Sequence, residues 1–178
     1  MGKVGLEITL PEADISGTVV GAEGARLSDA DGNILNIQQG ALSGNTPVET
    51  KTIAATSVSG IVGPDFTLLR AIDVSLGGKT LSSSAELSIP APQGINLSLP
   101  IVIARAIEVK GATKLKLVAL AKVSGSLISS SALSASSAVK GLNVSGVYYV
   151  LQAKAPLGFV NGKVTDASNN PYPSALVT

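Results

Sequence analysis

Carboxylate, hydroxyl and amide side chains are the groups that could do chemistry in this 178-residue sequence, because it contains no His, Cys or Trp. Asp29, Asp31 and Asn33 stand at alternate positions, which is the ligand spacing of a calcium-binding loop. Such a loop also requires a downstream acidic residue that binds the ion with both oxygens, and Leu42 stands near that position. The residues favour a turn in which Asp and Asn side chains bond the local backbone and Gly32 takes a positive φ, so we expect no metal.

The missing residue types exclude several classes of enzyme. Without His or Cys there is no Ser-His-Asp or Cys-His nucleophile, no His/Cys zinc or copper site and no disulfide. The densest acidic group is scattered over separate strands and turns, so its spacing does not indicate a glycosidase-type carboxylate pair. Its members are Glu7, Glu12, Asp14 and Glu23. We expect a protein that is not an enzyme and that binds no cofactor.

The charge balance does not favour a nucleic-acid or membrane partner. The 13 Lys and Arg residues against 12 Asp and Glu give a net charge of +1, and they form no basic cluster. No apolar run reaches the roughly 18 residues of a membrane span, and no signal sequence opens this chain. Lys114, Lys116 and Lys122 are expected on one face of a single strand, where they would discourage edge-to-edge aggregation.

Short β-branched or Leu-rich runs bounded by Gly, Pro, Asn, Asp or Ser predict an all-β chain. Alternation is clearest where Ala85, Leu87 and Ile89 are expected to face inward and their neighbours outward, as in antiparallel sheets with one dry face. We expect an antiparallel β-sandwich, either single or divided into two packed sub-sandwiches. The strands are predicted at residues 4–10, 15–20, 25–28, 34–38, 48–56, 66–76, 85–89, 96–99, 101–108, 114–123, 142–152 and 159–165.

The sequence gives little indication of a helix. The best candidate is residues 128–140, but 7 of the 13 residues from Gly125 to Ser137 are Ser, which indicates a loop or a frayed turn instead. Aromatic residues make up only 3% of the chain, so the core must consist of Val, Leu, Ile and Ala. Tyr148 and Tyr149 are adjacent and must face opposite sides of a strand, so one is expected in the core and the other at its rim.

A longer pattern surrounds the first turn. Residues 21–46 contain a Gly-rich strand, an Ala-Asp-Gly turn, an alternating strand, the tripeptide Gly40-Ala41-Leu42 and a polar turn. This order resembles the ZU5-type module of bacterial surface and secreted proteins, although Gln38 stands where the family usually has Pro. Gly63-Pro64-Asp65-Phe66 and Ser88-Ile89-Pro90 look like two further motifs of that family. The resemblance covers residues 14–153 and implies a ZU5-like sandwich.

Some relatives of this fold, including ZU5-UPA and autoproteolysis-inducing domains, cleave themselves at a His-Phe-Ser or His-Leu-Thr motif in their last strand. The resemblance places Val144, Ser145 and Gly146 at that motif, so the basic His is missing and Gly146 stands where the nucleophile would be. An N-to-O acyl shift needs a hydroxyl aligned on the scissile carbonyl and a group that takes its proton. We therefore expect a degenerate motif and no self-cleavage.

Residues 159–178 resemble the opening strands of a carboxypeptidase-regulatory-like domain, which is an Ig-like β-module. The expected organisation is a lead-in over 1–13, the ZU5-like module over 14–153, a linker over 154–158 and a partial second module over 159–178. Alternatively, the last segment is an extra hairpin on the first domain.

These observations together predict a non-catalytic structural or adhesion module of a multi-domain exported bacterial protein, located outside the cell or on its surface. It would act as a spacer or assembly unit whose partners are neighbouring β-domains. Two alternatives stay open. One is a protein- or carbohydrate-binding module, and the other is a subunit that exchanges strands with its copies in an extracellular fibre, because an incomplete β-module exposes strand edges.

Overall fold

The computed structural model describes residues 17–58, 60–131, 139, 141–157, 168 and 170, and these residues form an all-β fold. Within them no helix is long and apolar enough to cross a membrane. In this described part of the chain, one 3-10 turn, η1 (Ala55–Ser57), interrupts the strands. The strands are β1 (Thr18–Val20), β2 (Ala25–Ser28), β3 (Ile34–Ile37), β4 (Thr46–Ile53), β5 (Phe66–Ser75), β6 (Glu86–Pro90), β7 (Ile101–Val109), β8 (Ala112–Ser124), β9 (Leu127–Ser131) and β10 (Gly146–Ala153).

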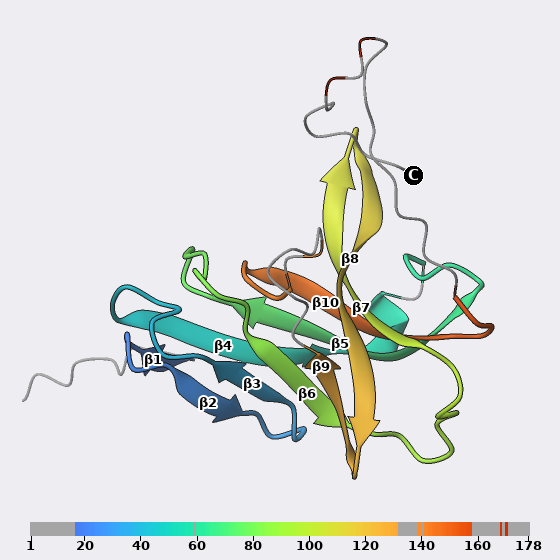
Figure 1. Cartoon of the computed structure of the whole chain (residues 1–178), viewed down its shortest axis with the longest axis horizontal. Coiled ribbons are helices and arrows are strands. Elements are labelled where there is room, and N and C mark those ends of the chain that lie inside the picture. Colours follow the sequence, from blue (N-terminus) through green and yellow to red (C-terminus); the bar gives the residue numbers. More distant parts are fainter. Residues whose placement is uncertain are drawn as a thin grey trace, which may run out of the picture.

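All ten strands belong to one antiparallel sheet, in the order β1-β4-β5-β10-β7-β8-β9-β6-β3-β2. The sheet curls until it is nearly a barrel, so its two edge strands, β1 and β2, lie close together at one end of the molecule (Figure 1). A groove of about 400 Å³ between these edges is lined by residues of 17–18, 27–29 and 48–50. The expected all-β antiparallel fold is therefore confirmed, and the layers of the expected sandwich are two halves of one continuous sheet.

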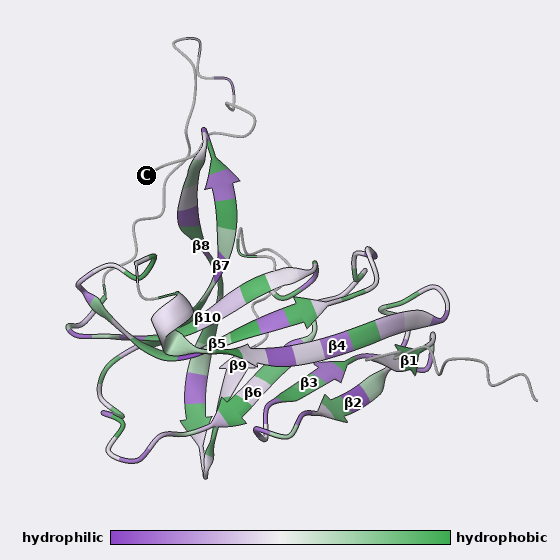
Figure 2. Ribbon diagram, turned by 180° about the vertical axis from the view of Figure 1, so that it is seen from behind, coloured by the Kyte–Doolittle hydropathy of each residue, from purple (hydrophilic) through white to green (hydrophobic). Residues whose placement is uncertain are grey.

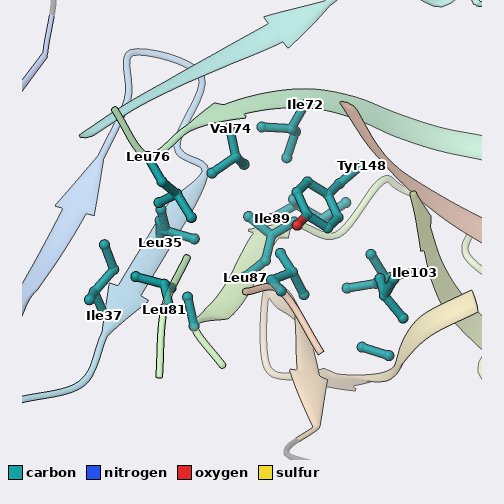
Figure 3. Close-up of a cluster of buried hydrophobic side chains, with 14 of the residues drawn as sticks. Leu35, Ile37, Ile72, Val74, Leu76, Leu81, Leu87, Ile89, Ile103 and Tyr148 are labelled. Atoms are coloured by element: carbon teal, nitrogen blue, oxygen red, sulfur yellow. The ribbon is translucent and has the colours of Figure 1, made fainter. Parts of the chain in front are cut away.

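The main core lies inside the curl. The largest of its fully buried side chains are Val, Leu and Ile residues together with Tyr148 (Figure 3). Bands of hydrophobic and hydrophilic residues follow one another along the strands (Figure 2). Ala85, Leu87 and Ile89 are buried in this core and Glu86 and Ser88 are less so, which confirms the alternation expected for this strand. Packing of β-branched and Leu side chains thus holds the sheet closed.

A second apolar cluster lies on the outer face of β5, β10, β7 and β8, which we call the outer cluster. Its buried members are Val58, Ala71, Val102, Ala104, Tyr149 and Leu151. Because Tyr148 belongs to the main core, the two tyrosines face opposite sides as expected, but Tyr149 is only 2% exposed. The expectation of a rim or surface position for one of them was wrong, because Tyr149 packs in the outer cluster, to which Val58, Ile61 and Val62 after η1 also belong.

Two local predictions were wrong. Residues 127–131 form β9, not a helix or loop, because Ile128 enters the main core while the serines bond neighbouring strands through their side chains. The hydroxyl of Ser130 accepts the backbone N–H of Leu87, and that of Ser131 donates to the carbonyl of Leu120. Conversely, residues 96–99 form turns, because the Asn96 side chain accepts a hydrogen bond from the N–H of Ser98 two residues on.

A β-bulge in β8 separates the three lysines expected on one face. The pairing of β7 with β8 shifts register at Val118, so Val118 and Ala119 both face the main core. Beyond the bulge the alternation is inverted. Lys114 and Lys116 therefore point to the side that Val118 faces, whereas Lys122 points to the outer side, and the expectation of a single basic stripe was wrong.

Candidate functional site

Val144 and Ser145, two of the three residues expected at a degenerate cleavage motif, lie directly before β10, and Gly146 is its first residue. The last strand begins at Gly146, so Val144 and Ser145 form a bend and not the strand interior that the sequence predicted. Leu142, just upstream, makes a single bridge with Ala85 and is buried in the main core. The bend is therefore fixed in sequence between a core anchor and a central strand.

Three elements contact this bend. The hydroxyl of Ser145 accepts a hydrogen bond of 2.9 Å from the backbone N–H of Leu76, which directly follows β5. Nη1 of Arg105 on β7 donates to the carbonyl oxygen of Ser145 at 3.3 Å. The hydroxyl of Tyr148 on β10 donates to the carbonyl oxygen of Val144 at 2.5 Å. The bend is thus bonded to three neighbouring strands of the sheet.

Gly146 sits against the side chain of Arg105. A Cβ at this position would lie 3.4 Å from Cδ of Arg105, and the φ of Gly146 is +146°. A Cβ at this distance would make only ordinary contact with the arginine, whereas a φ of +146° is one that residues with a side chain rarely adopt. The backbone conformation, and not the packing of Arg105, therefore requires glycine at this position.

The bend has part of the geometry that an acyl shift requires. Gly146, at the expected nucleophile position, has no hydroxyl, so the one hydroxyl among these three residues is that of Ser145. The Tyr148 hydroxyl is placed as an oxyanion donor would be, on the carbonyl of Val144 that Ser145 would attack. However, the Ser145 hydroxyl accepts a backbone N–H, and the charged group bonded to the bend is the guanidinium of Arg105, which does not take up a proton. The contacts that the structure describes therefore hold the bend in place and supply no base.

Burial affects both adjacent tyrosines. Desolvation raises the pKa of the Tyr148 hydroxyl, while the charge of Arg105 and the hydrogen bond to Val144 lower it to a smaller extent. Desolvation also raises the pKa of Tyr149. Tyr148 thus stays protonated at neutral pH and keeps its role as a hydrogen-bond donor.

The calcium-like triplet forms the turn predicted for it. Oδ1 of Asp29 accepts hydrogen bonds from the N–H groups of Asp31 and Asn33, and its Oδ2 accepts one from Nδ2 of Asn33 at 2.7 Å. Gly32 has a φ of +77°. The amide nitrogen of Asn33 faces the carboxylate, so these side chains do not converge through oxygen atoms, and the described residues contain no group of three or more acidic residues that could hold a metal.

Asn33 is fully buried and only partly satisfied. Its Nδ2 also donates to the hydroxyl of Thr52 on β4 at 2.9 Å, which ties the turn after β2 to a strand near the other edge of the sheet. Its Oδ1 is buried without a hydrogen-bond partner. A buried acceptor without a partner lowers the free energy of unfolding, so the structural role of Asn33 comes at a cost in stability.

The remaining candidates do not form a site in the part of the chain that the structure describes. Glu23 bonds the N–H of Gly21 within the turn between β1 and β2, while Glu7, Glu12 and Asp14 lie outside the described residues. Among the aromatic residues, Tyr148 and Tyr149 are buried and Phe66 packs on the outer cluster. Phe159 and Tyr172 lie outside the described residues, so no sugar-stacking platform can be built from the described aromatics.

Sequence reasoning missed Arg105, the one charged side chain that bonds the bend among the residues that the structure describes. The sequence does mark Arg105 faintly, because it is a single cation within the apolar run from Ile101 to Ile107.

Comparison of the chain with models of known families and with curated proteins finds no match.

Proposed function

We propose that the chain is a non-catalytic structural module of a multi-domain exported protein, in which it spaces or joins neighbouring β-domains. The observation that carries this proposal is the placement of β1 and of residues 154–157, which directly follow β10. β1 lies at one end of the long axis and residues 154–157 lie at the other (Figure 1). The view from behind agrees (Figure 2). A module whose first strand and last described segment lie at opposite ends is suited to join domains in line.

Hydrogen bonds that fix the direction of the chain after β10 support the same role. The N–H of Ala153 donates to the carbonyl of Pro100, and the N–H of Lys154 donates to that of Asp65 at 2.9 Å. Nζ of Lys154 also donates to the carbonyl of Pro64 at 2.6 Å, and Leu157 packs on the outer cluster. The expected linker thus begins as a segment bonded to the module, which would set the direction of the following domain.

The proposed location outside the cell rests on the resemblance to bacterial surface modules. The lack of Cys agrees with it only weakly, since proteins of many compartments lack disulfides. Protease or antibody access to the intact producing cell tests it directly. Digestion of the module only after lysis would contradict it.

The spacer role is tested by a distance measurement between the two ends. Because the chain has no Cys, Thr18→Cys and Pro156→Cys place nitroxide labels at two exposed positions only. We expect one narrow distance distribution by pulsed electron resonance. The control pair is Lys51→Cys with Asp73→Cys, which are exposed register partners on β4 and β5. Its distance distribution has the width that the labels alone produce. An end-to-end distribution much broader than the control would contradict a rigid spacer.

A second candidate, strand exchange between copies, is favoured by the groove between the sheet edges. β1 has three residues and pairs only with Thr46–Val48, so no named strand of the described residues covers that side of β4 beyond Val48. Extended segments add readily to such edges. Light scattering that shows a monomer at all concentrations would exclude this candidate.

A further inference from the structure

The loop that joins β6 to β7, residues 91–100, carries a short motif on an exposed turn. The loop runs outside the curled sheet (Figure 1). Its residues Asn96, Leu97 and Ser98 match the Asn-X-Ser/Thr acceptor pattern of N-glycosylation, in which X is any residue except Pro. Because so short a pattern also arises by chance, its placement in the fold decides whether a transferase could use it.

The turn presents this motif with its two essential groups unused. Oδ1 of Asn96 accepts the N–H of Ser98 at 3.0 Å, and the carbonyl oxygen of Asn96 accepts the N–H of Leu99 at 3.2 Å. Asn96, Leu97 and Ser98 are all exposed. In the described part of the chain, no hydrogen bond engages Nδ2 of Asn96, which would receive the sugar, or the hydroxyl of Ser98, which completes the acceptor pattern.

The backbone of the turn is fixed to the end of β10. Nε2 of Gln152 donates to the carbonyl oxygen of Asn96 at 2.7 Å, and the N–H of Ala153 donates to the carbonyl of Pro100. The motif therefore stands on a rigid support, beside the point where the chain leaves the module. A bulky, hydrophilic group attached here would lie next to the junction with the following segment.

Leu97 is an independent sign that this turn is suited to a covering group. It is 73% exposed, more than Val19, the other exposed large hydrophobic residue in the described part of the chain. Leu97 lies between the acceptor Asn96 and the hydroxyl of Ser98 in sequence. Sugars attached to Asn96 would therefore shield its side chain from water.

The sequence contains the same pattern once more, at Asn143, Val144 and Ser145, and there the fold uses the groups itself. The hydroxyl of Ser145 accepts the N–H of Leu76 at 2.9 Å, and the carbonyl oxygen of Asn143 accepts the N–H of Leu81 at 2.8 Å. All three residues are only partly exposed. The structure thus leaves one copy of the pattern accessible and bonds the other into the bend before β10.

We propose that Asn96 is an N-glycosylation site that receives an oligosaccharide from a polyprenyl diphosphate donor. A bond forms between Nδ2 of Asn96 and the anomeric carbon of the first sugar, while the bond from that carbon to the diphosphate breaks. The polyprenyl diphosphate leaves with the electron pair of that bond, and the amide nitrogen gives up one proton to a base of the transferase. The inference rests on the proposed function, since glycosylation of this kind acts on exported chains.

Peptide mapping of the chain recovered from its producing cells tests this site. Trypsin separates the two copies of the pattern, because residues 80–105 and residues 141–154 each lie between consecutive Lys or Arg residues. We expect one oligosaccharide on Asn96 in the first peptide and the unmodified mass for the second. An unmodified first peptide, or a glycan on Asn143 alone, would overturn the proposal.

Transfer to the folded chain in vitro tests whether the turn itself is the acceptor. The probe is a purified oligosaccharyltransferase of Asn-X-Ser/Thr specificity with a lipid-linked oligosaccharide. Ser98→Ala removes the hydroxyl but keeps Asn96 and the backbone N–H that its side chain accepts, and Ser98→Thr is the conservative control. We expect the mass of one oligosaccharide to be added to the original chain and to Ser98→Thr, and to be lost in Ser98→Ala.

Equal modification of Ser98→Ala and the original chain, or no transfer to the folded original chain, would contradict the proposal. The failure of this site can be told apart from the failure of the proposed function. A chain that protease reaches on intact cells but that carries no glycan would exclude the site at Asn96 and leave the exported role standing.

Discussion

Arg105 and Tyr148 are register partners on neighbouring strands, and their side chains bond the carbonyl oxygens of two consecutive residues, Ser145 and Val144. One cation and one hydroxyl on the same side of the sheet therefore fix the bend before β10. The strand they start from is central, since β10 pairs with both β5 and β7. Fixing this bend fixes the register of three strands.

Removal of the Tyr148 hydroxyl should loosen the bend. Tyr148→Phe deletes the hydrogen bond to Val144, and we expect a loss of about 1 kcal/mol in the free energy of unfolding. Amide hydrogen exchange of residues 142–146 should quicken. Tyr149→Phe removes a hydroxyl on the opposite face and is the control. Equal amide exchange rates at residues 142–146 in both variants would show that the hydrogen bond to Val144 does not stabilise the bend.

Stability should fall at alkaline pH because of the two tyrosines. Burial raises the pKa of both hydroxyls above the usual 10.0, so the folded state favours the protonated form. Their contribution is complete below about pH 10 and is lost as the pH rises from there through the folded-state values. Urea titrations at pH 8 to 11 measure this slope. A Tyr148→Phe/Tyr149→Phe variant should show a shallower slope, and an unchanged slope would assign the effect to other groups.

Gly24 should tolerate no side chain. Its φ is +73°, and a Cβ there would lie 2.7 Å from the carbonyl carbon of Gln38 and 2.8 Å from the backbone nitrogen of Gln39. We expect Gly24→Ala to cost roughly 3 kcal/mol of unfolding free energy through strain and backbone displacement. Gly78→Ala is a close control, because its φ is +74° with open space around it, and it should cost about 1 kcal/mol. Equal losses in thermal or urea melts would contradict the packing argument.

Asp29 should act through its turn and not through a metal. Asp29→Ala removes acceptors for three hydrogen bonds, and we expect about 2 kcal/mol of destabilisation in urea unfolding. Asp31→Ala, at the exposed neighbouring position, should have little effect. The melting temperature should be the same in excess calcium and in chelator. A rise of several degrees with calcium that disappears in Asp29→Ala would instead show a bound ion.

The chain should stay in one piece at the bend. We expect a single full-length band on a denaturing gel after prolonged incubation, because Ser145 is bonded to a backbone N–H and to no base among its described contacts. Intact mass measurement gives the same answer independently. Two tightly associated fragments split at Ser145, absent from Ser145→Ala, would reverse this prediction.

Local patterns predicted much of the strand content but little of the site. The runs that became β2, β5 and β7 were found within about one residue, since apolar alternation and flanking turn residues define them locally. The turn at Asp29 was also predicted, because Asx chemistry acts within a few residues. The contact of Arg105 with Ser145 joins residues 40 positions apart, and no local pattern encodes such a pair.

Tertiary context decided the elements that the sequence misjudged. Ser129 and Ser130 have poor strand propensity in isolation, yet their hydroxyls bond Ser88 and Leu87 across the sheet. Tyr149 is buried in a cluster that joins residues of β5, β7 and β10 with Val58, which lies outside the strands. The register shift at Val118 has no signature in the sequence, so the single basic face could not be corrected beforehand.

The extra residue at Val118 gives one strand two opposite dry sides, which has a consequence for how this gene can vary. Leu117 and Ala119 pair with the consecutive residues Ala104 and Ile103 of β7, so loss of the Val118 codon would remove the bulge and leave both flanks on their present sides. Loss of a codon elsewhere in β8 would instead turn the residues on one flank of the gap to the opposite side. We therefore expect descendants of this gene to vary the length of β8 at Val118 alone, and length changes elsewhere in β8 to be eliminated.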